Sequence, residues 1–149
     1  MTPDAIRRVQ SSYEKIGDRG DALATAFYKD LFGRAPGLRR VFPDDLTSLK
    51  GHFDAALALV IRNLDSIGTI EPALRDLGAQ HVHWGARPED YVVARDALVT
   101  ALRELSGSTW TAEIERDWRD AIALISATML QGAAVETAVF AERLIDQES

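Results

Sequence analysis

The chain has 149 residues, no cysteine, three histidines and a formal net charge of −6 at pH 7. A hydrophobic content of 46% indicates a globular protein, and the length suits a single domain, which we place at residues 1–149. The lack of cysteine excludes disulfides, thiolate metal ligands and thiol nucleophiles, and no basic face that would indicate a nucleic-acid partner is visible.

The first ten residues, MTPDAIRRVQ, lack the apolar core of a signal peptide. No apolar run approaches the roughly 20 residues that a membrane span needs. We therefore expect a cytoplasmic protein with no membrane partner.

Helical periodicity dominates the chain, and alternation with period two is almost absent. The first expected helix covers 3–16, with Thr2 as its cap and Gly17 as its stop. A second helix is expected over 21–35, followed by one or two helical turns that end near Phe42.

The strongest helical pattern covers residues 46–68. Its broad apolar face consists of Leu49, Phe53, Ala56, Leu57, Val60, Ile61 and Leu64. A shorter helix is expected over 69–85, and a further one begins at Pro88 and ends at Gly107. The last helix is expected from Thr111 to about residue 144, with a polar, fraying end over 141–149.

This pattern predicts an all-α protein with six long or medium helices and one or two short ones. The helices differ in length, which favours an irregular crossed packing over an up-down bundle of equal partners.

The segment LGAQHVHWGARPEDY, residues 77–91, holds two of the three histidines. His81 falls on the line of Leu74 and Leu77, whereas His83 lies about 200° away around the helix. His81 is therefore either a core histidine satisfied by a backbone carbonyl or a ligand that holds haem iron in an apolar slot. We interpret His83 as a surface residue.

His52, the third histidine, sits at the edge of the apolar face of its helix. It is either a boundary residue with a solvated ring or a group at the mouth of a pocket. Because His81 and His83 point apart, the three histidines do not predict a zinc site. A Gly-rich phosphate loop and a Gly-x-Ser-x-Gly motif are both absent.

Three segments, taken in order, resemble the single-domain bacterial globins that are related to the haem domain of flavohaemoglobins. They are AFYKDLFGRAPGLRRVFPDD, LGAQHVHWGARPEDY and WTAEIERDWRDAIALISATML. The resemblance implies a globin fold, in which six to eight crossed helices enclose a haem pocket.

The resemblance also implies that His81 is the axial ligand of haem b, with its other ring nitrogen donating to a carbonyl near Leu77. Phe42 would pack on the porphyrin, and the hydroxyl of Tyr28 would donate a hydrogen bond to the bound ligand. Further residues expected at the haem are Leu49, His52, Phe53, Leu57, Leu77, Trp84, Tyr91 and Leu98.

The distal helix departs from the family pattern. Counting back from residues 60–67 puts the distal position at Leu49, whereas counting forward from Phe42 puts it at His52. We favour Leu49, because loops accept deletions more readily than helices do. His52 would then bond a haem propionate, reach the ligand or coordinate iron as a sixth ligand.

The proximal side departs as well. Flavohaemoglobin-type sites pair the tyrosine that corresponds to Tyr91 with a glutamate on the last helix. Spacing from Trp118 puts that position at Ala133, and Glu136 lies nearly one turn further on. This incomplete network weakens the case for peroxidase-like chemistry.

Three functions are compatible with these residues. The first is a haem-binding, oxygen-binding globin, with dioxygen, nitric oxide or carbon monoxide as small ligands. The second is a nitric oxide dioxygenase that works with a separate reductase, since no flavin or nicotinamide domain is present in these residues. The third is a stand-alone globin-fold sensor. Both a monomer and a homodimer are compatible with the sequence.

Overall fold

The computed structural model describes residues 1–17, 19 and 21–148. These residues form six α-helices and three short 3-10 helices, labelled η, and no strand. In chain order they are α1 (Pro3–Ile16), α2 (Ala22–Arg34), η1 (Pro36–Val41), α3 (Thr47–Arg62), η2 (Leu64–Thr69), α4 (Glu71–His83), α5 (Pro88–Ser106), η3 (Gly107–Thr109) and α6 (Ala112–Glu148). The predicted all-α class is confirmed.

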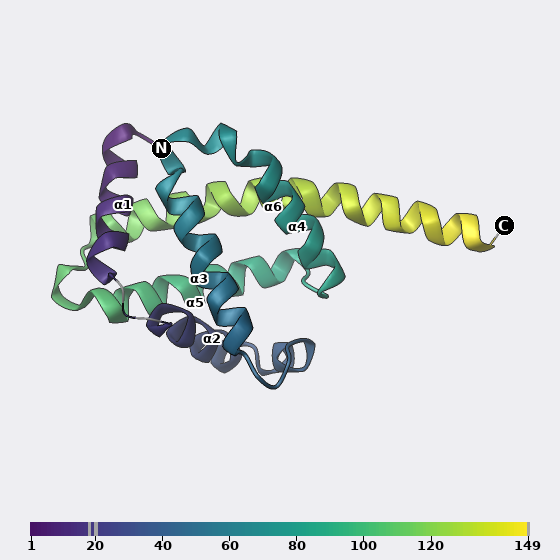
Figure 1. The fold of residues 1–149 in the computed structure, drawn as a ribbon, viewed down its shortest axis with the longest axis horizontal. Helices are drawn as coiled ribbons and strands as arrows, with labels where there is room; N and C mark the ends of the chain where they lie inside the picture. Colours follow the sequence, from purple (N-terminus) through teal and green to yellow (C-terminus); the bar gives the residue numbers. More distant parts are fainter. Residues whose placement is uncertain (18, 20, 149) are drawn as a thin grey trace.

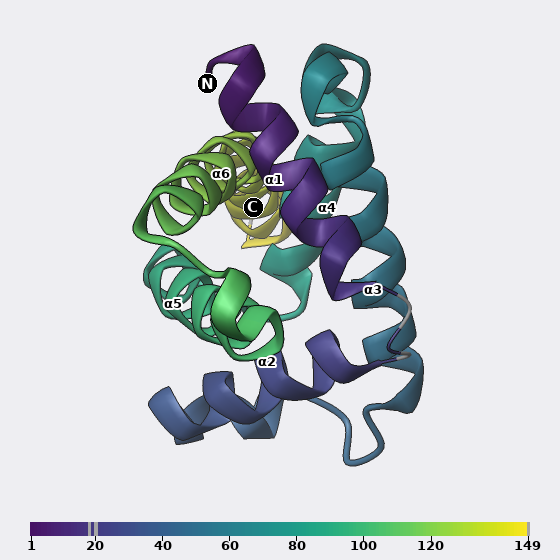
Figure 2. The same cartoon turned by 90° about the vertical axis from the view of Figure 1, so that its left-hand side faces the viewer.

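The helices cross one another in two groups (Figures 1 and 2). Figure 2 shows α5 and α6 on one side and α3 and α4 on the other, with α1 and α2 between and below them. The most extensive contact joins α4 to α6, and the next joins α2 to α5. This crossed packing of unequal helices is the arrangement that the sequence predicts.

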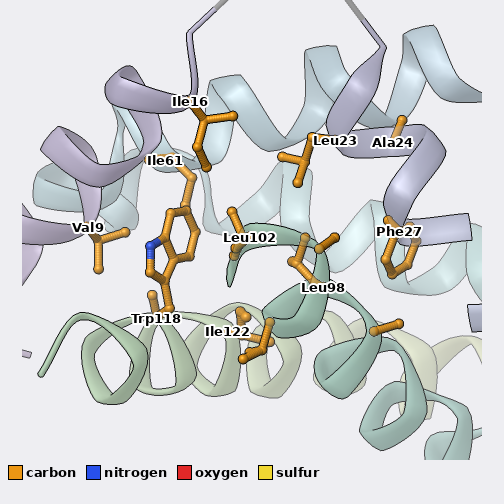
Figure 3. Close-up of a cluster of buried hydrophobic side chains, with 14 of the residues drawn as sticks. Val9, Ile16, Leu23, Ala24, Phe27, Ile61, Leu98, Leu102, Trp118 and Ile122 are labelled. Carbon is orange, nitrogen blue, oxygen red and sulfur yellow. The ribbon is translucent and has the colours of Figure 1, made fainter. Parts of the chain in front are cut away.

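The core lies where α1, α2, α5 and α6 meet (Figure 3). Trp118 of α6 is fully buried and lies between Val9 and Leu102, with Ile61 above it. Its indole Nε1 donates a hydrogen bond to Ser12 Oγ at 3.1 Å, which satisfies both buried polar groups. Burying such an aromatic side chain contributes roughly 1.5–3 kcal/mol to folding.

The ends of several helices follow local sequence signals. The Thr2 hydroxyl accepts a hydrogen bond from the Ala5 amide at 3.1 Å and caps α1, and Gly17 ends that helix with φ +68°. Thr111 caps α6 in the same way, through the Ile114 amide. These predicted boundaries are confirmed.

The helix expected over 46–68 is wrong in its second part. The α-helix stops at Arg62, and a 3-10 helix follows, with non-helical dihedral angles at Ser66. The side-chain amide of Asn63 donates to the Leu59 carbonyl and competes with the continuing helix. Leu64 still reaches the core, as its place on the apolar face predicts.

The last helix is longer than predicted. Residues 141–148 continue α6 without a break, so the fraying end expected there is wrong. In Figure 1 this part of α6 leaves the body of the protein and projects away from it.

By length and composition alone, the segment 112–147 of α6 could cross a membrane, contrary to the sequence expectation that no such segment exists. The structure gives its first half another role, because that half packs against α1, α4 and α5.

Candidate functional site

An aromatic cluster lines the space between α2 and α3. The Tyr28 ring lies 5.0 Å from Phe27, 5.8 Å from Phe53 and 5.7 Å from Phe42, measured between ring centroids. Phe27 and Phe53 stack at 4.6 Å, which joins α2 directly to α3. The geometry is that of ordinary offset and edge contacts, so these rings pack into one rigid wall.

Tyr28 is buried in this wall, with 7% of its surface exposed. Its hydroxyl forms no hydrogen bond with any residue that the structure describes. Burial, with a smaller contribution from the Asp54 carboxylate, raises the pKa of Tyr28 to about 12. The hydroxyl therefore remains a proton donor throughout the physiological range.

His81 lies on the last turns of α4 and is half-buried. Its Nδ1 lies 2.7 Å from the Leu77 carbonyl oxygen and donates to it, which is the hydrogen bond that we predicted. Burial lowers the pKa of His81, with the hydrogen bond opposing that shift. The neutral ring is thus held in one tautomer, with the Nε2 lone pair available for another partner.

Two glycines hold α4 tightly against α6. A Cβ at Gly78 would lie 1.8 Å from the Met129 carbonyl oxygen, and one at Gly132 would lie 2.0 Å from that of Arg75. The two backbones therefore touch where either glycine stands. We did not predict this pair from the sequence, although a lone glycine inside a helix costs about 1 kcal/mol and often marks a close approach.

The site residues predicted on α3 lie on two different faces of that helix. Leu49, Phe53 and Leu57 are partly buried and pack against the core, whereas His52 is exposed to solvent. The inward set agrees with the register that puts Leu49, and not His52, toward the interior. Leu98 of α5 is buried, and it belongs to the same core.

Trp84 and Tyr91 flank His81. The Trp84 ring lies 4.8 Å from the imidazole and the Tyr91 ring 6.1 Å, measured between centroids. Trp84 is 53% exposed, so only part of its indole covers the histidine. The Tyr91 hydroxyl is buried without a hydrogen-bond partner among the described residues, and burial raises its pKa.

Glu136 pairs with His83 and not with Tyr91, which is the partner that the family pattern gives a glutamate on this helix. Its Oε1 lies 2.9 Å from Nε2 of His83, and Ala133, which sequence spacing puts at the position of the expected glutamate, is buried. The prediction that His83 is a surface residue is confirmed, but its pairing with Glu136 was not foreseen. Their separation of 53 residues leaves no local signal for that contact.

Two hollows adjoin these residues. One, of about 480 Å³, opens to solvent beside η1 and includes Phe42 in its wall. The other, of about 250 Å³, lies between α3 and α4 and reaches Leu77, the acceptor for His81. Apart from Asp76 and Gln80, apolar side chains line the second hollow: Ala56, Leu59, Val60, Ile70, Ala73, Leu74 and Leu77.

The described residues contain no group of three or more His, Asp or Glu side chains that could hold a metal ion. A half-buried neutral histidine, an apolar space and a buried phenol form a donor set that suits haem iron.

The fold and the site together define a class of all-α protein. A family model described as Globin matches residues 25–129. The chain belongs to the globin family, whose members bind haem.

Relatives of two kinds are similar in sequence. Leghemoglobin 3 of Sesbania rostrata is 28% identical over 133 residues, which cover 81% of this chain and 90% of that protein. A flavohemoprotein of Vibrio cholerae is 25% identical over 148 residues, covering 96% of this chain and 36% of its own length. A flavohemoprotein of Halalkalibacterium halodurans is 26% identical over 135 residues, which cover 88% of this chain and 33% of that protein. The chain thus spans about a third of these flavohemoproteins.

Solved structures share the fold. A candidate nitric oxide dioxygenase of Rhodothermus marinus, engineered as a carbene transferase, aligns with a TM-score of 0.85 and 21% identity. The alignment covers 95% of this chain and 99% of that one. A bacterial globin from Campylobacter jejuni aligns with a TM-score of 0.77 and 17% identity. That alignment covers 93% of this chain and 99% of the globin. At these identities the likeness concerns the fold alone.

Proposed function

We propose that this chain is a haem-binding globin that reversibly binds dioxygen or another diatomic ligand, with His81 as the protein ligand of the iron. The observation that carries the proposal is the Nδ1 contact with the Leu77 carbonyl at 2.7 Å. A histidine oriented in this way presents Nε2 as a ligand and gains basicity from the carbonyl. Haem b would supply iron with an open coordination position.

The residues present fit that cofactor. The Tyr28 hydroxyl forms no hydrogen bond with the described residues, although it is buried. The hydroxyl is therefore available to donate a hydrogen bond to a ligand that accepts one. Phe42, Phe53 and Leu57 would supply apolar contacts to the porphyrin.

The wall around Tyr28 would keep water from the ligand and hold the phenol in place. Its ring contacts four phenylalanines, which limits its rotation: Phe27 and Phe32 of α2, Phe53 of α3, and Phe42, which follows η1. Tyr28 would donate to the ligand, and its raised pKa of about 12 keeps the proton on the phenol. Leu49 would face the ligand from α3, and His52 would lie outside the contact unless its ring turns inward.

An absorption spectrum with and without carbon monoxide tests the proposal. We expect a Soret band after addition of haem, and its shift when carbon monoxide binds to the reduced protein. His81→Leu should abolish stable haem ligation, and His83→Leu, a matched change on the outer face of α4, should not. A chain that forms no Soret band with haem would remove the haem-based function.

A second candidate is a nitric oxide dioxygenase that receives electrons from a separate reductase. The sequence similarity to flavohemoproteins across 96% of this chain favours it. The missing glutamate partner of Tyr91 disfavours it, because the ligand histidine then lacks a carboxylate that would increase its electron donation.

Rapid mixing of the oxygenated protein with nitric oxide distinguishes the two candidates. A dioxygenase should produce nitrate in a single turnover, with one equivalent formed per haem. Slow nitrate formation, below one equivalent, would leave reversible ligand binding as the function.

A further inference from the structure

Residues 42–46 join η1 to α3 and belong to neither helix. The segment begins with Phe42, whose ring packs against Tyr28. Among the described residues, no main-chain amide donates to the carbonyl oxygens of Phe42, Pro43 or Asp44. Each of these oxygens can accept a hydrogen bond, so this part of the segment depends on a side-chain donor to hold its shape.

Arg39 of η1 supplies that donor. Its Nη1 donates to the Pro43 carbonyl at 2.9 Å and, at 3.4 Å, to the Phe42 carbonyl. Its Nη2 donates to the Asp44 carbonyl at 3.0 Å. Hydrogen bonds from a charged donor are stronger than those between neutral groups. One guanidinium therefore holds three consecutive carbonyls, and it forms no ion pair with a carboxylate of the described chain.

The same guanidinium lies over an aromatic ring of the wall around Tyr28. Its Cζ is 5.2 Å from the ring centroid of Phe32. A cation at this distance from the face of a ring is attracted to it. The Phe32 ring in turn meets the Phe42 ring edge-on at 5.2 Å and lies 5.9 Å from the Tyr28 ring. Arg39 thus contacts the backbone of Phe42 directly and its ring through Phe32.

Both contacts at once require arginine. The guanidinium is a planar fork with five N–H donors, so two of its nitrogens reach carbonyls while its face rests on a ring. Lysine would keep the charge but presents a single nitrogen on a flexible stem. The next residue, Arg40, is exposed and forms no hydrogen bond or ion pair with any residue that the structure describes. It therefore provides a matched comparison for Arg39.

Water has access to these hydrogen bonds. Arg39, Phe42 and Asp44 all line the hollow of about 480 Å³ that opens to solvent beside η1. Water in that hollow competes for the same carbonyl oxygens, so the segment stays closed only while the guanidinium holds it.

We propose that Arg39 is a positioning residue of the candidate site, which holds residues 42–44 closed and thereby fixes Phe42 against Tyr28. The contact of Phe42 with haem belongs to the proposed function, so any effect of Arg39 on the cofactor rests on that function. The closure of the segment does not. Separate measurements test the two parts.

Backbone order parameters from ¹⁵N relaxation test the closure. They are measured on the full chain with reduced haem and carbon monoxide, and again without haem. In Arg39→Lys the order parameter of the Asp44 amide should fall from about 0.85 to below about 0.6. Thr47 should stay ordered, because its amide and hydroxyl donate to Asp45 Oδ1 at 3.0 and 2.7 Å. Arg40→Lys should change neither value.

Two results would overturn the closure. One is an Asp44 order parameter that is the same in the wild type and in Arg39→Lys. The other is a fall that extends through α5 and α6, because Arg39 would then support the fold in general and not this segment.

Transfer of haem to an excess of an acceptor protein tests the effect on the cofactor. Arg39→Lys should lose haem about 3- to 10-fold faster than the wild type, the range expected for one hydrogen bond, and Arg40→Lys should not. Phe32→Leu removes the ring beneath the guanidinium. In that background Arg39→Lys should have a smaller effect, because the two residues share one contact.

Equal rates of haem loss in the wild type and Arg39→Lys would refute the role of Arg39 at the cofactor. A chain that binds no haem would instead remove the proposed function, and the order parameter of Asp44 without haem would still decide whether Arg39 holds the segment.

Discussion

A Cβ placed on Gly78 would lie 1.8 Å from the carbonyl oxygen of Met129, so α4 and α6 touch through their backbones. Gly132 makes the reciprocal contact with Arg75. His81 stands three residues after Gly78 on the same helix. The position of the candidate iron ligand is therefore set by a contact that only glycine permits.

Gly78→Ala should lower the free energy of unfolding by about 1–3 kcal/mol. The methyl group meets backbone atoms, which cannot rotate away, and overpacking of this kind outweighs the roughly 1 kcal/mol that alanine gains over glycine in a helix. Urea unfolding followed by circular dichroism measures the change.

Gly51→Ala is the matched control for that substitution. Gly51 lies inside α3 with no atom within 4 Å of an added Cβ, so alanine should stabilise the protein by up to about 1 kcal/mol. If Gly78→Ala were as stable as Gly51→Ala, the tight α4–α6 contact would be wrong.

Tyr28→Phe should speed the dissociation of dioxygen. Loss of one hydrogen bond to a ligand that carries negative charge costs about 1.5–3 kcal/mol, roughly a 10- to 150-fold change in rate. Laser photolysis and stopped-flow mixing measure that rate. Carbon monoxide, which accumulates little charge, should dissociate at nearly the same rate as before, and Tyr13→Phe on α1 should change neither rate.

The raised pKa of Tyr28 predicts that the protein loses stability at high pH. Its pKa is 10.0 in the unfolded chain and about 12 in the fold, so the stability that it contributes is complete below pH 10 and is lost as the pH rises through about 12. Between these values the free energy of unfolding should fall more steeply in the wild type than in Tyr28→Phe. Parallel curves for the two proteins would mean that the phenol is not buried.

Tyr91→Phe should leave the protein as stable as before or stabilise it by up to about 1 kcal/mol, because the buried hydroxyl has no partner among the described residues. Thermal and urea unfolding both measure this. A clear destabilisation would reveal a hydrogen bond to Tyr91 and restore the proximal network that the sequence lacks.

His52→Ala separates two conformations of α3. With the exposed ring that the structure shows, the substitution should leave both the ferrous spectrum and the ligand dissociation rate unchanged. If the wild-type ferrous protein shows the two sharp visible bands of a six-coordinate haem and the variant loses them, His52 closes onto the iron instead.

The helical pattern and several helix ends follow from the sequence, because they depend on neighbours within one or two turns. Thr2, Gly17 and Thr111 act through contacts three or four residues away. The opposite directions of His81 and His83 follow from the same local geometry. Family resemblance then adds a role for His81 that periodicity alone leaves open.

Contacts between distant residues follow only from the tertiary structure. The pairing of Glu136 with His83 depends on how α4 crosses α6. Two counts of the sequence left the distal register three residues apart, and the exposed position of His52 beside the partly buried Leu49 comes only from the tertiary structure. A helix pattern specifies which face is apolar, but which partner covers that face depends on packing across the whole chain.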